Sequence, residues 1–339
     1  MVFSSKLLQF VVVGKLNRNF ILTANGAAAL DSPGGSLVYA AAGLRLWQQG
    51  IGLIGRAGED YPAEWLERMR TEGLDIRGVK ILPETLDLRY FASHPDPVTS
   101  ILSNPVSEFA KHQLPFPKAL LGYNPTTENV DSKVTASLTT IRGHDFPEDF
   151  LDVKAAHFAP VDYLTHSLLP SIFRQHQVNT LTLDPSEGYM TPSFWEEIPG
   201  LLRGITVFHS AERKLRSLFQ GRTDDIWEMI DAISAMGVEI IVVKRAEKGQ
   251  WVIDVPGKRR WEVPAYPAKV INVTGAGDAF CGGFLGGYKD TYDPLEAALH
   301  GNISASFVVE GTDPFYILDT LPQLINLRLD YVRSLVREI

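Results

Sequence analysis

Apolar and polar positions alternate regularly along the C-terminal half of this chain. From about residue 150 onward, short β-branched runs are separated by amphipathic segments, a pattern typical of a parallel sheet flanked by helices. The runs that predict strands are 155–159, 180–184, 205–209, 238–244 and 268–273. The segments that predict helices are 165–176, 211–219, 224–236, 294–309 and 321–336.

The N-terminal third shows the same alternation with an interruption. An apolar run at 10–14 predicts a strand, a polar stretch extends to Asp31, and a helix at 36–49 and a strand at 51–55 follow. Residues 83–130 are too rich in proline to form core helices or central strands. We therefore expect this last segment to lie outside the core layers.

Length and composition place the chain among globular proteins. Its 339 residues are 45% apolar, enough for one large α/β domain with an appendage or for two domains. A net charge of -8 argues against broad binding of nucleic acid, although it leaves room for a small phosphorylated ligand.

The cysteine content and the N-terminal sequence bear on the compartment. A single cysteine, Cys281, cannot form an internal disulfide. The apolar run at 7–13 is broken by Gln9 and followed by basic residues, unlike a signal peptide or a membrane span. We therefore expect a cytoplasmic protein with no membrane partner.

The string from residue 270 to residue 288 carries the strongest chemical signal. A β-branched run leads into small residues and then into a helix, where Gly275 and Gly277 leave no side chain to block a phosphate. Asp278 follows directly, and a carboxylate beside an anion site can take the proton from an attacking hydroxyl. These residues predict phosphoryl transfer. The alternative is an N-capping aspartate on a glycine-rich packing helix.

Two common nucleotide motifs do not fit this string. The chain has no Gly-x-x-x-x-Gly-Lys-Ser/Thr, and Phe280 stands where a dinucleotide fingerprint needs its third glycine. Residues 274–280 instead resemble the C-terminal signature of the PfkB family, the ribokinase-like sugar and nucleoside kinases. The first two positions of that signature differ, being Asn272 and Val273 here. The resemblance implies that Asp278 is the catalytic base. It implies an anion hole formed by Thr274, Gly275, Ala276 and Gly277.

The same resemblance implies the fold and the assembly. Ribokinase-like kinases are α/β proteins, three-layer sandwiches with a mostly parallel central sheet and a small β lid over the substrate. We expect residues 1–339 to form one such kinase domain, with the lid built from about 16–32 and 83–130. A homodimer formed through the lid is a candidate assembly.

Substrate contacts are implied near the N-terminus. Gly34 and Gly35 lead into an alanine-rich helix and resemble the glycine pair whose N–H groups bond substrate hydroxyls, although paired glycines also form simple turns. Where the family has an asparagine on that helix, this chain has Tyr39, so a pocket shaped for ribose cannot be assumed. The family's Asn-x-Asp appears with Asn17 and Asn19, and an amide at the second position would alter recognition. A polar turn is the alternative for that pair.

Nucleotide contacts are implied by two later motifs. Residues 244–249 resemble a family Lys-x-Gly-x-x-Gly, in which Lys244 would bind phosphate, Ala246 replaces the first glycine and Gly249 is the second. A lysine that only extends from a strand end is an equal alternative for Lys244. Asn302 lies in a stretch that borders the adenine in relatives.

The remaining resemblance lies at residues 209–213, where relatives carry an Asn-x-x-Glu that organises metal and phosphates. Ser210 stands for the Asn and Arg213 for the Glu. Glu212 is adjacent, but one helical step turns a side chain by about 100 degrees, so Glu212 need not take over the metal role. An ordinary capped helix start is the alternative here.

These features predict an ATP-dependent kinase that phosphorylates a hydroxymethyl group on a sugar or a sugar-like molecule, with Mg2+ bound alongside ATP. Many ribokinase-like enzymes also bind a monovalent cation through the first aspartate of the signature, and with Asn272 in that place we expect weak or absent activation by potassium. Two alternatives stay open. One is a nucleoside kinase in which Tyr39, Tyr90 or Phe91 stacks on the base. The other is a protein of the same fold that binds its ligand without turnover.

Overall fold

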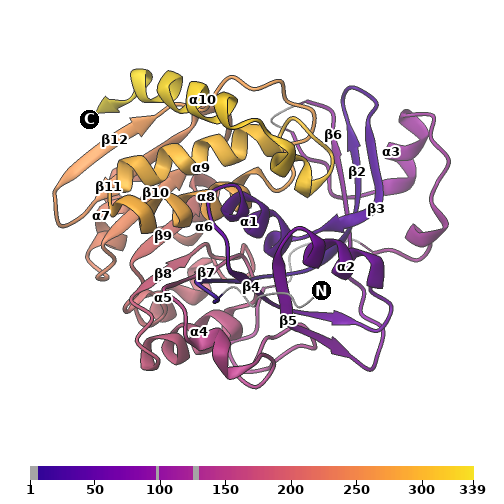
Figure 1. Ribbon diagram of the computed structural model, residues 1–339, viewed down its shortest axis with the longest axis horizontal. Coiled ribbons are helices and arrows are strands. Elements are labelled where there is room, and N and C mark those ends of the chain that lie inside the picture. The colour runs from indigo at the N-terminus through magenta and orange to yellow at the C-terminus, as the bar shows by residue number, and fades with distance from the viewer. Residues whose placement is uncertain (1–6, 97–98, 125–129) are drawn as a thin grey trace.

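A ten-stranded sheet forms the centre of the computed structural model, which describes residues 7–96, 99–124 and 130–339. Its order is β13-β12-β11-β10-β9-β8-β7-β1-β4-β5, parallel from β10 to β5 and antiparallel from β10 to β13 (Figure 1). The strands of this sheet are β1 (Phe10–Val13), β4 (Ile51–Gly58), β5 (Leu74–Leu82), β7 (Ala155–Phe158), β8 (Thr180–Leu183), β9 (Val207–Ala211), β10 (Ile240–Lys244), β11 (Gln250–Asp254), β12 (Arg259–Val263) and β13 (Arg337–Glu338).

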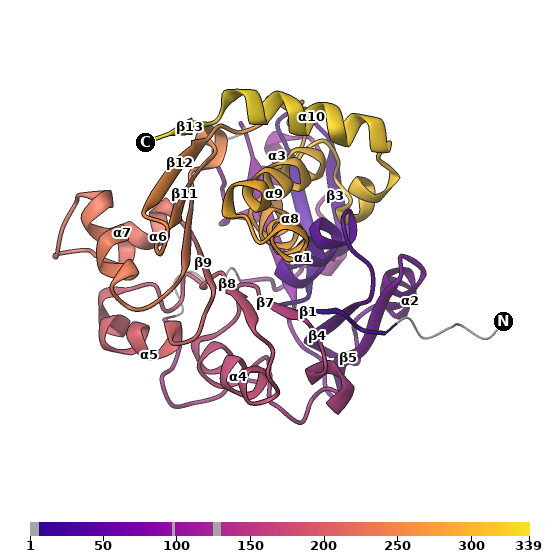
Figure 2. The same cartoon turned by 60° about the vertical axis from the view of Figure 1, so that its left-hand side comes forward.

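Helices cover both faces of this sheet and bury separate apolar cores (Figure 2). One face carries α1 (Ser36–Arg45), α2 (Ala63–Thr71), α8 (Ala276–Thr291), α9 (Pro294–Val308) and α10 (Pro322–Leu335). The other carries α4 (Tyr163–Gln175), α5 (Ile198–Leu202), α6 (Glu212–Leu218) and α7 (Ile226–Ser234). The three-layer α/β sandwich predicted from the sequence is confirmed. The short 3-10 helices are 118–120, 148–151, 192–197, 246–248 and 314–319.

A second, three-stranded sheet stands beside the first (Figure 1). It has the order β3-β2-β6, from β2 (Asn17–Thr23), β3 (Ala28–Gly34) and β6 (Arg89–His94). Helix α3 (Pro105–Lys111) packs on it through a small core around Phe20, Phe91 and Phe109. This is the small β lid of the predicted fold, and the polar stretch before Asp31 forms its hairpin. Residues 97–98 and 125–129 of the predicted lid lie outside the described residues.

One predicted strand is wrong. Residues 268–273 form an irregular segment and pair with no strand. The N–H groups of Ile271 and Asn272 both donate to the carbonyl oxygen of Val309, at 2.7 and 3.1 Å. A single oxygen that accepts two successive N–H groups fits a turn docked against the end of α9, whereas a sheet ladder would pair each strand residue in turn.

The sheet contains edge strands, such as β12, that the hydrophobic pattern does not predict. In β12 only Trp261 and Val263 are buried, and they alternate with Arg260 and Glu262. Such a half-exposed strand lacks the continuous apolar run that marks the central strands. Strand β9 begins at Val207, two residues after its predicted start, and α1 ends at Arg45, before the predicted residue 49.

No helix in the described part of the chain is long and apolar enough to cross a membrane.

Candidate active site

Helix α8 begins at a turn that only glycine can make. Gly275 is its N-cap, with a φ of 79°, and a Cβ atom there would lie 2.1 Å from Cγ of Tyr39. Gly277 lacks this constraint, because its φ is not positive and an added Cβ would come no closer than 3.4 Å, to Nζ of Lys244. Gly275 is therefore required by the fold, whereas Gly277 presents an exposed backbone surface that a ligand can approach.

Two backbone N–H groups at this helix start are free. The N–H of Ala276 donates to the carbonyl of Val273 at 3.3 Å, and that of Asp278 donates to the carbonyl of Gly275 at 3.1 Å. Within the described residues, nothing accepts a hydrogen bond from the N–H of Gly275 or Gly277. Unpaired N–H groups at the positive end of a helix dipole are suited to bind an anion, so the anion site at these residues stays a prediction.

Asp278 lies in the first turn of α8, beside these free N–H groups, and is half-buried. Burial raises the pKa of its carboxyl to about 6, and the negative charge of Asp184 adds to the rise against the opposing charge of Lys244. No described residue donates a hydrogen bond to this carboxylate. An unpaired carboxylate with a pKa near 6 is well suited to accept a proton at neutral pH.

A buried ion network holds α8 from below. Asp184, which follows β8, accepts a hydrogen bond from Nζ of Lys214 at 3.0 Å and pairs with Lys244 through its other oxygen. Burial would raise the pKa of Asp184, yet the two ammonium groups hold it well below its usual range. Nζ of Lys244 also donates to the carbonyl of Gly277 at 3.2 Å. The network therefore ties the first turn of α8 to the ends of β8 and β10.

Comparison with known proteins identifies the family of the chain. The model of the pfkB family carbohydrate kinases matches residues 148–320, about half of the chain. The chain belongs to the pfkB family. It is therefore a phosphotransferase that acts on an alcohol group, as its signature string predicts.

Individual relatives of this pfkB-family protein are distant. A cytidine kinase of Thermococcus kodakarensis is 26% identical over 292 residues, which cover 84% of this chain and 89% of the relative. The Burkholderia thailandensis nucleoside kinase in complex with inosine matches with a TM-score of 0.67 at 18% identity, covering 96% of this chain and 99% of that one. An E. coli protein described as ribokinase II, solved with ATP and Mg2+, has a TM-score of 0.67 at 15% identity, with 96% and 100% covered. At these identities the two structures support the fold alone.

The residues predicted to bind substrate gather between the small sheet and the start of α8. Gly35 is the N-cap of α1, with a φ of 96°. Gly34 lies so close to Asn19 that a Cβ would meet its Nδ2 at 2.0 Å. Asn19 is buried and its Oδ1 has no hydrogen-bond partner, while Asn17 is only partly buried in β2. An unsatisfied buried oxygen at this place is what a polar ligand could pair with.

Tyr39 stands where the sequence comparison with the family expects an asparagine. Its ring packs on Gly275 and lies beside Asn19, and burial raises the pKa of its hydroxyl above the usual value. Tyr39 is only 3% exposed. The substitution therefore places an aromatic ring between the predicted substrate residues and the anion site.

Several residues predicted to bind nucleotide have their polar groups occupied. Nζ of Lys244 belongs to the network around Asp184. The amide of Asn302 donates to the carbonyl of Pro264 at 2.8 Å and accepts from the N–H of Tyr266 at 3.1 Å. Asn302 therefore shapes the loop after β12. Its role beside a nucleotide, like that of Lys244, stays a prediction.

In the turn from Ala246 to Gly249, the alanine has a positive φ, which is harder for it than an ordinary negative φ. Ala246 has a φ of 52°, in the left-handed region that disfavours an alanine. Gly249 has a φ of 82°, and a Cβ there would lie 2.1 Å from the carbonyl oxygen of Val263. The alanine at the family's first glycine is therefore a strained replacement.

The predicted metal ligand is engaged elsewhere. The carboxylate of Glu212 accepts hydrogen bonds from Arg216 and lies 3.8 Å from Arg245. Ser210 is buried and its hydroxyl donates to the carbonyl of Ala211 at 3.1 Å. The described residues contain no group of three or more His, Cys, Asp or Glu side chains that could hold a metal ion. The structure thus gives no support for Glu212 as a metal ligand.

Sequence reasoning missed one contact of the anion site. His94, at the end of β6, hydrogen bonds to the side chain of Thr274, at 2.8 Å between Nε2 and Oγ1. The two residues are 180 positions apart in the chain. No motif marks His94, so only the fold reveals the pair.

Proposed function

We propose that this protein transfers the γ-phosphate of ATP to a hydroxymethyl group of a sugar or of the ribose of a nucleoside. The observation that carries the proposal is the pairing of a free, half-buried carboxylate at Asp278 with the free N–H groups of Gly275 and Gly277. A base and an anion site side by side are what hydroxyl-to-phosphate transfer requires. Membership of the pfkB family supports the same reaction.

The proposed chemical step needs one base and one anion site. The substrate hydroxyl attacks the γ-phosphorus, its proton passes to the carboxylate of Asp278, and a new P–O bond forms. The bond from the γ-phosphorus to the bridging oxygen breaks, which releases ADP. The N–H groups of Gly275 and Gly277 receive the negative charge that develops on the transferred phosphoryl group. The start of α1 at Gly35 holds the acceptor in line with this phosphoryl group.

Mg2+ is proposed to arrive on the triphosphate. When bound, it would neutralise charge on the phosphate oxygens. Because the described residues offer no cluster of metal-ligating side chains, the triphosphate and water would supply most of its ligands. The E. coli relative solved with ATP and Mg2+ supports this choice of donor and ion. The cytoplasmic location stays a prediction.

A nucleoside acceptor is favoured by one aromatic residue. Phe91 is fully buried in the core of the small sheet and Tyr39 is buried against Gly275, so neither presents a free face to a base. Tyr90 is half-buried, and no described residue bonds its hydroxyl. Burial raises the pKa of its hydroxyl to about 12, with smaller contributions from Tyr123, Glu187 and Asp278. In the small sheet Tyr90 stands opposite Asn19, one of the residues predicted to bind substrate. The names of the Thermococcus and Burkholderia relatives point the same way.

The test is a screen of purified protein with ATP and Mg2+ against free pentoses, hexoses and nucleosides, with each product identified by mass and by 31P NMR. We expect one class to give a phosphate monoester on its hydroxymethyl carbon. Phosphorylation of cytidine or inosine with loss of turnover in Tyr90→Leu, but not in Tyr123→Leu, would establish the nucleoside acceptor. Tyr123 is a suitable control because it lies on the small sheet with its hydroxyl engaged by Phe91 N–H at 3.3 Å. Absence of any phosphorylated product would support the binding protein without turnover.

A further inference from the structure

His94 bridges two hydroxyl groups at the end of the small sheet. Its Nε2 lies 2.8 Å from Oγ1 of Thr274, and its Nδ1 lies 3.0 Å from Oγ of Ser100. The side chain is buried, at 5% exposure. Thr274 opens the anion-binding segment, and its own N–H donates to Oδ1 of Asn272 at 3.0 Å. The imidazole therefore connects the small sheet to the first residue of the anion site.

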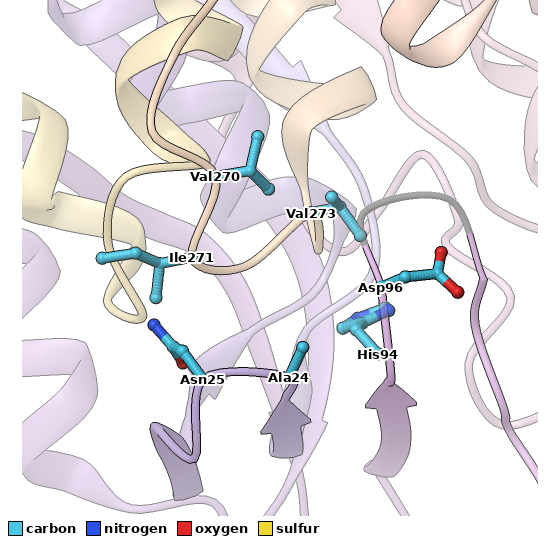
Figure 3. Close-up of a pocket in the computed structure, with 7 residues that line it drawn as sticks. All are labelled: Ala24, Asn25, His94, Asp96, Val270, Ile271 and Val273. Atoms are coloured by element: carbon cyan, nitrogen blue, oxygen red, sulfur yellow. The ribbon is translucent and has the colours of Figure 1, made fainter.

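This bridge is a hydrogen bond across the junction, by which we mean the place where the small sheet meets residues 270–278. Within the described residues, no other hydrogen bond joins the strands of the small sheet to residues 270–278. A partly open cavity of about 70 Å³ lies beside this contact. Figure 3 shows that cavity, lined by Ala24, Asn25, His94, Asp96, Val270, Ile271 and Val273. A junction with a cavity and few hydrogen bonds to the small sheet can open without breaking a packed core.

The protonation state of His94 defines how the bridge works. Burial lowers the pKa of the imidazole below its usual value, against the opposing effect of a hydrogen bond to the backbone of Thr99, and so favours the neutral ring. In a neutral ring one nitrogen donates and the other accepts. We assign the ring proton to Nε2, so that Nε2–H donates to Oγ1 of Thr274 and Nδ1 accepts from the hydroxyl of Ser100. The hydroxyl proton of Thr274 is then free to turn toward an anion at the start of α8.

We propose that His94 is a positioning residue that couples closure of the small sheet to the anion site by orienting the Thr274 hydroxyl toward the transferred phosphate. This inference rests on the proposed phosphoryl transfer. With the junction closed, Thr274 adds a third donor to the N–H groups of Gly275 and Gly277. With the junction open, that donor is no longer oriented and the site is open to water. Closure of the small sheet thus adds a hydrogen-bond donor at the site where phosphate charge develops.

Two matched variants separate this role from simple space filling. The amide nitrogen of His94→Gln reaches the place of Nε2, opposite Thr274, whereas that of His94→Asn reaches the place of Nδ1, opposite Ser100. Both remove the imidazole. Loss of one such hydrogen bond corresponds to about a five- to tenfold effect. We expect His94→Asn to lower kcat by about this factor and to raise the ATP hydrolysed per acceptor phosphorylated, while His94→Gln stays close to the wild type.

A double-mutant cycle tests the partner. Thr274→Val removes the hydroxyl and keeps the branched shape, and Thr274→Ser keeps the hydroxyl as the matched control. We expect His94→Asn to have little further effect on kcat in the Thr274→Val background, and its full effect in Thr274→Ser. Ser93→Ala is the control for damage within the small sheet itself, because Ser93 donates to Glu108 at 2.9 Å and does not contact the anion site.

Amide hydrogen exchange supplies a readout that does not need activity. With Mg2+ and a non-hydrolysable ATP analogue bound, β2 and β6 should exchange about five to ten times faster in His94→Asn than in His94→Gln. Equal kcat, equal uncoupled hydrolysis and equal exchange in the two variants would overturn the proposal. If the wild type phosphorylates none of the acceptors, the proposed function fails, while the exchange comparison still decides whether His94 holds the junction closed.

Discussion

Gly282 of α8 lies directly against the backbone of Ala40 in α1. A Cβ atom at position 282 would sit 1.9 Å from the carbonyl oxygen of Ala40, and one at Gly43 would sit 2.1 Å from the carbonyl oxygen of Ala279. Since Tyr39 also contacts Gly275, the contacts show that both helices begin at the same end of their crossing. Two positive helix ends are thus held together, one carrying the proposed substrate glycines and the other the anion site.

This crossing should be intolerant of added volume. Gly282→Ala places a methyl group on backbone atoms that cannot rotate away, so we expect a loss of about 1–3 kcal/mol in the free energy of unfolding. The measurement is urea denaturation of the purified variant.

Gly286→Ala is the matched control for the crossing. Its Cβ would meet side-chain atoms of Trp47 and Gln48 at 3.1 and 3.3 Å, and side chains can adjust. We expect the control to differ from the wild type by less than about 1 kcal/mol, because helix propensity favours alanine. Equal effects of the two substitutions would contradict a rigid backbone contact at Gly282.

Ala246 should be improved by glycine. A left-handed φ of 52° costs an alanine about 1–2 kcal/mol. Glycine relieves this strain, but the greater freedom of its unfolded chain offsets about 0.5–1 kcal/mol of the gain. We expect Ala246→Gly to raise the free energy of unfolding by about 0.5–1 kcal/mol.

Ala235→Gly provides the opposite case. Ala235 is an exposed alanine with a right-handed helical φ of -65° at the end of α7, so glycine there should lower stability. Thermal unfolding of both variants checks the pair. A loss of stability in Ala246→Gly would mean that the turn is not strained by its alanine.

The charge of Asp278 should destabilise the folded protein at neutral pH. Burial raises its pKa from 3.8 to about 6, so the folded state binds this proton more tightly than the unfolded chain does. The contribution of this group to the free energy of unfolding therefore falls as the pH rises between these values and stays low above them. Asp278→Asn should be more stable than the wild type at pH 7.5 by on the order of 1–3 kcal/mol.

The difference between Asp278→Asn and the wild type should disappear as the pH falls. Near pH 3.8 the wild-type carboxyl is protonated when folded, and the two side chains become electrically alike. Denaturation curves at several pH values measure the trend. An Asn variant that is less stable than the wild type at pH 7.5 would show that the carboxylate charge is favourable where it lies.

Activation by potassium should be weak or absent. Asn272 is buried and its Oδ1 already accepts the N–H of Thr274, so it offers a neutral oxygen that is partly used. A unit charge at 4 Å is worth about 4 kcal/mol at an effective dielectric of 20, and an amide does not supply it. The measurement is turnover at constant ionic strength with potassium replaced by a large organic cation, in the wild type and in Asn272→Asp. A strong potassium requirement in the wild type would show that backbone carbonyls suffice.

The central strands and the start of α8 could be predicted from the sequence because they depend on local pattern. Runs such as Ile240–Lys244 are continuous and buried, and the signature string specifies its own turn through Gly275. The run at 268–273 also contains several β-branched residues, yet contacts with Val309 decide its conformation. Local pattern cannot reveal that outcome.

The environment of the site side chains depends on residues far away in the chain. Lys244 could be recognised as a cation near phosphate, but its partner Asp184 is 60 residues away. His94 likewise could not be found from a motif, because its partner Thr274 is 180 positions away in the chain. Tyr39 was recognisable as a departure from the family, whereas its packing on Gly275 appears only when α1 and α8 are placed together.

The most direct test of the account is turnover of Asp278→Asn with the acceptor found in the screen. If Asp278 is the base, kcat falls by about 10²- to 10⁴-fold while the fold and the dissociation constant for ATP stay nearly unchanged. In the wild type, kcat/KM should also rise with pH through about 6 as this carboxyl ionises, and the variant should lack that rise. Turnover of Asp278→Asn within a few-fold of the wild type would contradict the central claim.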